Sequence, residues 1–324
     1  MITPVSTNVR RFSLVFVACL AGSVFSAGCA NDKERAPASA AVTGDEDEVN
    51  GTTYTDVTST LKTDADYEAW AALKRGLVQG FDEICGDTFC GGDISDLYAV
   101  NFTCSATEKT GKVRECLWTF GGSYTAVDGK TGKLTNVGRT YACKIPVSAS
   151  RADFLKLAQG EPLRDALPGK TTSIYDALGD CFASPPNLPL GTDGNFVDMN
   201  DVLGDTQWEK LSTARHNLRK NFDDVCGDTF CEGDYSDIES LTFRCSVERT
   251  TSKVGACVWT FAGAYGNVAK STGNVTSKRK SWNCALPTTG TLDQVLDTLI
   301  VPKAIDATLP GASKSIYDTL VDCL

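Results

Sequence analysis

Twelve of the fourteen cysteines in this 324-residue chain form two sets of six with nearly identical spacing. The first five members of each set, beginning with Cys85 and Cys226, are 141 positions apart, and the sixth pair is 142 apart. Such regularity indicates an internal duplication with one residue inserted late in the second copy. The sets are Cys85, Cys90, Cys104, Cys116, Cys143 and Cys181, and Cys226, Cys231, Cys245, Cys257, Cys284 and Cys323.

Cysteine pairs of this density are typical of exported proteins, because the cytosol keeps thiols reduced. The spacing Cys-x4-Cys, which occurs once in each copy, also raises a zinc site as an alternative. Structural zinc sites usually space their cysteines by two to four residues and often recruit histidine, of which the chain has one. The sequence therefore predicts disulfides as structural staples and no cofactor.

The N-terminus has the features of an export signal. Arg10 and Arg11 precede an apolar run over 12–25 that is too short to span a bilayer. The run ends in Phe-Ser-Ala-Gly-Cys, which resembles the lipobox of bacterial lipoprotein signal peptides, with Ser26 where that class usually has Leu. The resemblance implies removal of residues 1–28 and lipidation of Cys29. It predicts an outer-membrane or cell-surface lipoprotein anchored to the membrane, and cleavage without lipidation would instead give a secreted protein.

Charge divides the rest of the chain into modules and connecting segments. The formal net charge is −10, and the excess of acids lies in an acidic tether over 29–65 and a linker over 182–206. The cysteine-rich modules over 66–181 and 207–324 are close to neutral. The chain has no basic field of the kind that nucleic-acid binding requires, so nucleic acid is not expected as a partner.

Each module shows the same succession of hydrophobic patterns. An amphipathic helix is predicted from Tyr67, Trp70, Leu77, Phe81 and Ile84, and from the matching residues of the second copy. Three stretches of alternating polar and apolar residues follow, and then two short helices. The predicted fold is α+β, a tandem α-β-β-β-α-α module with an antiparallel three-stranded meander.

The meander predicts one disulfide in each module. Cys104 and Cys116 lie symmetrically about Thr110 in a predicted hairpin, which places them opposite each other on one face. The same reasoning pairs Cys245 with Cys257. The other four cysteines of each module allow three pairings. We favour Cys85–Cys181 with Cys90–Cys143, and local closure of Cys85–Cys90 is the rival.

Three aspartates follow or interrupt the short Cys-x4-Cys turn of each module. Oxygen-rich loops of this kind bind calcium in some proteins, yet Asp and Ser also stabilise turns through their own backbone. We favour the turn, and the calcium candidates are Asp87, Asp93 and Asp96, and Asp228, Asp234 and Asp237.

Other polar residues give no catalytic pattern that the two copies share. His216 is the single histidine, and Arg75 takes its place in the first copy. Carboxylate chemistry at Asp82 with Glu83, or at Asp223 with Asp224, remains an alternative to turn-flanking roles. Cationic side chains at the predicted hairpin tips are typical of solvent-exposed tips that protect the edges of a sheet. The alternative is that they contact anionic glycans or a protein. They are Lys109, Lys112, Arg114, Lys130, Lys133, Arg249, Lys253, Lys270, Lys278, Arg279 and Lys280.

Together these features favour a non-catalytic surface or envelope lipoprotein that serves binding, adhesion or envelope structure, with an unknown protein or glycan ligand. One alternative is an inhibitor of a secreted hydrolase, which would present a protruding loop that differs between the copies. The other is an extracytoplasmic hydrolase that depends on carboxylates, which would need a cleft where those carboxylates converge.

Overall fold

The computed structural model describes residues 51–86, 88–90, 96–182 and 188–324, and both modules belong to one compact unit. Cys29, Asp87 and Asp93 lie outside the described residues, so the predictions made for them have no structural counterpart here.

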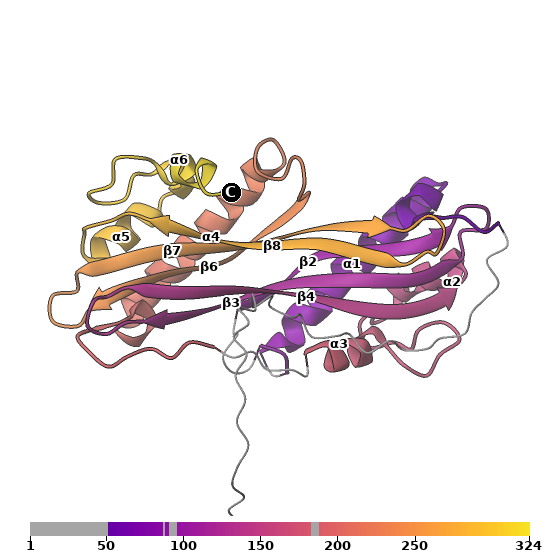
Figure 1. The fold of residues 1–324 in the computed structure, drawn as a ribbon, viewed down its shortest axis with the longest axis horizontal. Helices are drawn as coiled ribbons and strands as arrows, with labels where there is room; N and C mark the ends of the chain where they lie inside the picture. Colours follow the sequence, from indigo (N-terminus) through magenta and orange to yellow (C-terminus); the bar gives the residue numbers. More distant parts are fainter. Residues whose placement is uncertain (1–50, 87, 91–95, 183–187) are drawn as a thin grey trace, which may run out of the picture. The chain divides into compact units, whose positions relative to one another are not determined.

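The structure has the mixed α+β architecture that the sequence predicts, with its described residues forming two antiparallel sheets (Figure 1). Six disulfides link cysteines of this part of the chain. The first module contains β1 (Tyr54–Asp56), α1 (Asp64–Cys85), β2 (Asp96–Thr107), β3 (Val113–Val127), β4 (Leu134–Ala149), α2 (Arg151–Leu155) and α3 (Ile174–Phe182). The second contains β5 (Phe196–Asp198), α4 (Asp205–Cys226), β6 (Asp237–Glu248), β7 (Val254–Val268), β8 (Val275–Leu286), α5 (Leu292–Leu299) and α6 (Ile316–Val321). Short 3-10 helices lie at Val57–Thr60, Lys156–Gln159, Met199–Asp201 and Ala304–Asp306.

Each sheet has four strands, one more than the predicted meander. The strand orders are β1-β2-β3-β4 and β5-β6-β7-β8. The extra strands lie in segments that we assigned to the tether and the linker, because three-residue strands are too short to show an alternating pattern. Tyr54 pairs with Thr107, and Phe196 pairs with Glu248. The structured part of each module therefore begins about ten residues earlier than expected.

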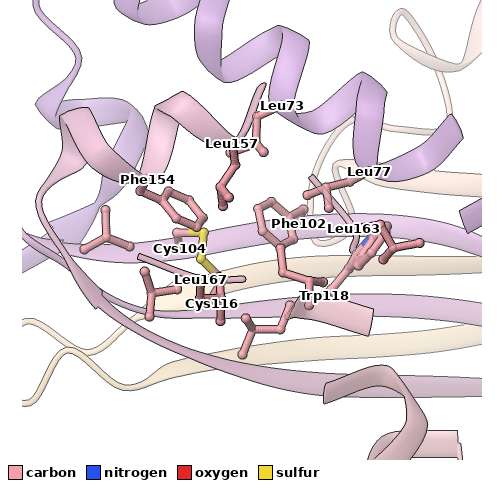
Figure 2. Packing of buried hydrophobic residues seen from close by; sticks show 14 of the residues in the cluster. Leu73, Leu77, Phe102, Cys104, Cys116, Trp118, Phe154, Leu157, Leu163 and Leu167 are labelled. Carbon is pink, nitrogen blue, oxygen red and sulfur yellow. A yellow bond between two sulfur atoms is a disulfide. The ribbon is translucent and has the colours of Figure 1, made fainter. Parts of the chain in front are cut away.

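One face of each sheet forms the hydrophobic core with the helices of its own module. In the first module Leu73 and Leu77 of α1 point toward Phe102 and Trp118 of the sheet (Figure 2). The second module repeats this arrangement around Phe243 and Trp259, which are almost fully buried. Burying a side chain of this size stabilises the fold by roughly 1.5–3 kcal/mol, so each module has a substantial core of its own.

The helix prediction is right in extent but assigns one position wrongly. α1 begins after Thr63, whose side chain accepts a hydrogen bond from the backbone N–H of Asp66, and both helices run to the first cysteine of their module. Tyr67, which we placed on the buried face, is 52% exposed, and its counterpart Trp208 is 41% exposed. The buried stripe starts one turn later, at Trp70, whose ring stacks on that of Phe102 in β2.

The strand register around the cysteines is the one that the hairpin symmetry predicts, and it shifts by one residue next to the turn, between Ser105 and Ala106, and again at the far end. Cys104 lies opposite Cys116, and their sulfurs are bonded, as are those of Cys245 and Cys257. Farther along, a bulge at Val100 shifts the pairing, so Phe120 lies opposite Ala99 instead of Val100.

The pairing that we favoured for the other cysteines is wrong. The structure has the bonds Cys85–Cys90 and Cys143–Cys181, and the second module has Cys226–Cys231 and Cys284–Cys323. The first pair closes the turn that follows the long helix. The second ties the third long strand of each module to its last helix, or, in the second module, to the turn directly after that helix.

The second face of each sheet packs against the other sheet. It carries small and hydroxyl-bearing side chains, which allow close approach: Thr103, Ser105, Thr119 and Gly121 in one sheet, and Thr242, Ser246, Thr260 and Ala262 in the other. A Cβ built on Gly121 would lie 2.2 Å from the Cβ of Ala262. The modules therefore bury an extensive surface against each other, although an acidic linker joins them.

The contacts between the modules are reciprocal. The backbone N–H of Tyr54 donates to the carbonyl of Lys270 at 2.9 Å, and the N–H of Phe196 donates to the carbonyl of Gly129 at 2.9 Å. Gly129 and Lys270 are matching residues of the two copies, and so are Gly121 and Ala262. Such reciprocity is the mark of an interface with twofold symmetry, so the chain resembles a homodimer joined into one polypeptide.

Several of the predicted exposed cations contact the other module. Lys270 lies 3.6 Å from a carboxylate oxygen of Glu108, at the tip of the hairpin between β7 and β8. Arg279 of edge strand β8 donates to the carbonyl of Thr140 on edge strand β4 at 3.4 Å. Ser281 and Asn283 donate in the same way to Gly138 and Asn136. Side chains thereby cover part of an edge that would otherwise present free carbonyls.

Candidate functional site

The aspartates singled out as calcium candidates do not form one cluster. Asp96 and Asp237 begin β2 and β6, where each turns toward the other module. Asp96 accepts from Arg244 at 3.4 Å, and Asp237 accepts from the side-chain amide of Asn101 at 2.7 Å. Asp228 is exposed in the turn after α4, and Asp234 lies 3.9 Å from the ammonium of Lys278. Within the described residues, no three acids, cysteines or histidines are placed to hold a metal ion together.

The other candidates from the sequence have separate locations. His216 is exposed on α4, and Glu83 and Asp224 are exposed near the ends of α1 and α4. Asp82 is exposed as well, and it also borders a cavity between the two modules. We call this cavity the seam pocket.

The seam pocket has a volume of about 270 Å³ and receives side chains from both copies. α1 contributes Leu77, Val78 and Asp82, and β2 contributes Tyr98 and Asn101. The second module adds Arg219 from α4, and Asp237 and Glu239 from β6. Apolar side chains therefore line one part of the wall, and carboxylates line another.

A smaller cavity of about 80 Å³ is the counterpart of the seam pocket in the second copy. Its lining residues match those of the seam pocket at the 141-residue interval: Leu218 matches Leu77, Phe243 matches Phe102, and Trp259 matches Trp118. We call it the filled pocket, because Arg215 and Arg219 stand where the seam pocket has Lys74 and Val78. The duplication has therefore produced two related cavities, of which one stays open.

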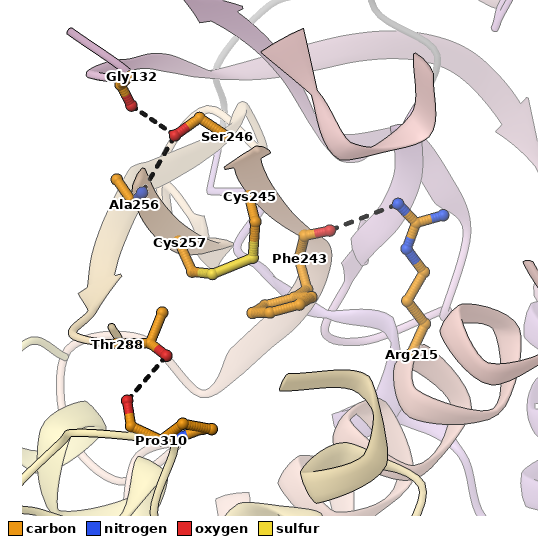
Figure 3. Close-up of a disulfide and its surroundings, with 9 residues drawn as sticks. All are labelled: Gly132, Arg215, Phe243, Cys245, Ser246, Ala256, Cys257, Thr288 and Pro310. Carbon is orange, nitrogen blue, oxygen red and sulfur yellow. Dashed lines mark hydrogen bonds between the residues drawn. A yellow bond between two sulfur atoms is a disulfide. The ribbon is translucent and has the colours of Figure 1, made fainter. Parts of the chain in front are cut away.

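The two arginines show how the walls of these cavities hold a guanidinium group. Arg215 donates to the carbonyl oxygen of Phe243 at 3.4 Å (Figure 3). Arg219 donates to a carboxylate oxygen of Glu239 at 3.0 Å. The guanidinium carbon of Arg219 also lies 4.3 Å from the centre of the Tyr98 ring, which is a cation–π contact. One carboxylate and one aromatic face together hold this cation between the modules.

Burial shifts the ionisation of the groups around the seam. It raises the pKa of Glu239 to about 7, although the positive charge of Arg219 acts in the opposite direction. Burial also raises the pKa of Asp82 and of its counterpart Asp223, and Arg219 offsets part of both shifts. The pKa of Tyr98 is raised by burial as well. The positive charge of Arg219 therefore does not offset the full cost of burying these carboxylates in their ionised form.

Glu239, whose pKa is shifted furthest among the acids at this site, has no direct signal in the sequence. Its counterpart in the first copy is Tyr98, so the position is not a repeated acid. Comparing the copies with each other does offer a signal, because Val78 and Arg219 also match in position and differ in charge. Both pairs of differing residues lie at the seam between the modules, so the two copies have diverged in charge at this site.

No protein-family model, curated protein or solved structure matches this chain. The description of the site therefore rests on the residues themselves. Among the described residues, none of the helices has the length and apolar character needed to cross a membrane. The six disulfides indicate an oxidising, extracytoplasmic environment.

Proposed function

We propose that this protein is a non-catalytic binding lipoprotein of the bacterial cell envelope, in which two fused modules hold a small ligand between them. The observation that carries the proposal is the contrast between the two related cavities. Arg215 and Arg219 fill one, whereas the seam pocket keeps about 270 Å³. Ligand sites commonly occur at such boundaries, with apolar walls and a few polar groups that orient the ligand.

Rigid construction supports a binding role. Three disulfides in each module and the sheet-on-sheet packing hold the lining residues in place. A preorganised pocket loses little conformational entropy when a ligand enters, so small ligands bind it more tightly than a mobile one.

The binding proposal is tested by thermal unfolding of the whole exported protein in the presence of small charged and neutral compounds. The control is Val78→Arg, which places in the seam pocket the residue that its counterpart position already has. A compound at 100 times its Kd stabilises a protein by about 2.7 kcal/mol, which gives a measurable rise in Tm. We expect at least one compound to raise the Tm of the unchanged protein and not that of the variant. If every compound acts equally on both, the pocket is not a binding site.

Anchoring to the membrane is the second part of the proposal, and it rests on the lipobox-like sequence before Cys29. Cys29→Ser is expected to move the protein from the membrane fraction to the soluble extracytoplasmic fraction, because two acyl chains give stable anchoring. Cys19→Ser is a matched control, since Cys19 lies inside the apolar run and is not expected to be lipidated. Membrane association that survives loss of Cys29 would contradict lipidation there.

A carboxylate-dependent hydrolase is the second candidate, because Asp82, Asp237 and Glu239 all line the seam pocket. A carboxyl with a pKa of about 7 suits a general acid near neutral pH. Against this role, Glu239 is bound to Arg219 at 3.0 Å. Hydrolysis of a glycoside or ester that is lost in both Asp82→Asn and Glu239→Gln would favour the enzyme over the binding protein.

A further inference from the structure

We propose that the ligand of the seam pocket is a small organic cation, an alkylguanidinium or alkylammonium group carried on a short apolar chain. This inference rests on the proposed binding function and specifies its ligand. The filled pocket is an internal template for the seam pocket, because its lining residues match those of the seam pocket and include two arginine side chains.

The volume of the seam pocket is explained by what its counterpart contains. In the second copy, the side chains of Arg215 and Arg219 occupy the cavity and leave about 80 Å³. At the matching positions the seam pocket has Lys74, which is exposed, and Val78, which is shorter than arginine and 41% exposed. The open space therefore corresponds to space that arginine side chains occupy in the other copy.

The walls of the seam pocket keep groups that suit a cation. Glu239 and Tyr98, which hold the guanidinium of Arg219, line the seam pocket as well. Asp82 stands at the pocket wall, and within the described part of the chain its carboxylate has no hydrogen bond or ion pair. The residue is exposed, yet partial burial still raises its pKa. Arg219 offsets only part of that shift, and a cation beside Asp82 would add to this compensation.

The remaining charges at the pocket are already engaged or lie toward solvent. Asp237 accepts from Asn101 at 2.7 Å, and Arg219 is bound to Glu239. Lys74 is exposed. Leu77, Val78 and Val100 offer apolar surface next to the carboxylates, which suits a short alkyl chain.

An anion fits this wall less well than a cation. It would have to lie beside Asp82, Asp237 and Glu239, and the positive charge of Arg219 is directed at Glu239. Like charges at such close range oppose binding, whereas a cation is attracted by the carboxylates.

Isothermal titration calorimetry of the whole exported protein tests the inference with four probes of similar size. The cationic probes are n-propylguanidinium, which reproduces an arginine side chain, and n-butylammonium. The controls are butyrate, which is an anion, and n-butanol, which is neutral. We expect one equivalent of a cationic probe to bind, and to bind at least about tenfold more tightly than either control.

Matched variants locate the site. Val78→Arg is expected to abolish binding of the cationic probe. Val78 is 41% exposed, so the longer side chain can be accommodated without repacking the core. Asp82→Asn is expected to weaken binding about fivefold, on the scale of a partly exposed ion pair. Asp223→Asn removes the counterpart carboxylate, which is not among the residues that line the seam pocket, and we expect it to leave binding within about twofold of the original protein.

The outcomes separate this inference from the proposed function. If butyrate or n-butanol binds as tightly as the cations and Val78→Arg abolishes that binding, the pocket is a ligand site and the cation inference is wrong. If the cations bind equally well to Val78→Arg, they bind elsewhere and the inference also fails. If none of the four probes binds, the cation inference is overturned, while the wider screen with Val78→Arg still decides the binding function.

Discussion

Gly121 gives the sharpest test of how the two sheets meet. A Cβ at this position would lie 2.2 Å from the Cβ of Ala262, whereas two carbon atoms in contact rest about 3.5–4 Å apart. Gly121→Ala therefore requires the sheets to separate locally by about 1.5 Å. A gap of even 0.5–1 Å removes roughly a quarter to a half of the dispersion energy of each contact.

The expected cost of Gly121→Ala is about 1–3 kcal/mol of unfolding free energy, the usual range for an overfilled interior. This sign is opposite to the ordinary effect in a strand, where replacing glycine with alanine stabilises by roughly 0.5–1 kcal/mol. Urea denaturation of the oxidised exported protein, followed by tryptophan fluorescence, measures the change. Gly179→Ala is the control, because no atom lies within 4 Å of the added Cβ.

The symmetry of the contact also predicts a rescue. Gly121 and Ala262 are matching residues that face each other, so the space between them holds one methyl group and not two. Ala262→Gly alone removes that methyl and costs about 0.8 kcal/mol, whereas Gly121→Ala together with Ala262→Gly moves it to the other sheet. The double variant should recover most of the loss caused by Gly121→Ala. A Gly121→Ala protein as stable as the original, or costs that simply add in the double variant, would refute the close approach.

Two further predictions concern pH and the disulfides. The raised pKa of Glu239 stabilises the folded state below pH 4.5, and this contribution is lost as the pH rises through about 7. At about 1.36 kcal/mol per pKa unit, and allowing for a side chain that is 30% exposed, the loss is about 1–3 kcal/mol. Urea denaturation of Glu239→Gln at pH 4, 5.5 and 8 should lack this component, and a pH dependence like that of the original protein would exclude Glu239 as its source. Replacing Cys143 and Cys181 by serine opens a loop with a sequence separation of 38, and we expect it to cost about 4 kcal/mol, against about 2 kcal/mol for Cys85 and Cys90, which are separated by 5. Equal changes in Tm for the two pairs of substitutions would contradict this loop-length argument.

Local patterns allowed prediction of the parts of the fold that depend on neighbouring residues. The alternation around Cys104 and Cys116 sets both the face and the register, so their bond follows from the hairpin itself. The bulge at Val100 could not be predicted in this way, because one extra residue in a strand leaves no recognisable signal in the sequence. The partner of Cys181 depends on where the last helix lies against the sheet, which is a matter of tertiary packing, and there the prediction was wrong.

The candidate site was less predictable, because its residues are distant in sequence and come from both copies. Asp82 was considered only with its neighbour Glu83, whereas the structure places it at the same cavity as Glu239. Repetition between the copies drew attention to the shared aspartates, such as Asp96 and Asp237, which serve contacts between the modules. The positions that reveal the site are those where the copies differ. Val78, for example, lines the open seam pocket, whereas its counterpart Arg219 lines the filled pocket.

The reciprocal hydrogen bonds of Tyr54 and Phe196 have a consequence for assembly. Two separate copies of one module would associate to a degree that depends on their concentration, and outside the cell that concentration falls by dilution. Covalent fusion replaces this dependence by a fixed effective concentration, so the interface persists in a single molecule. Fusion also removes the requirement that both halves change together, since a substitution in one half is no longer repeated in the other. A symmetric pair of modules can thus give rise to one asymmetric cavity.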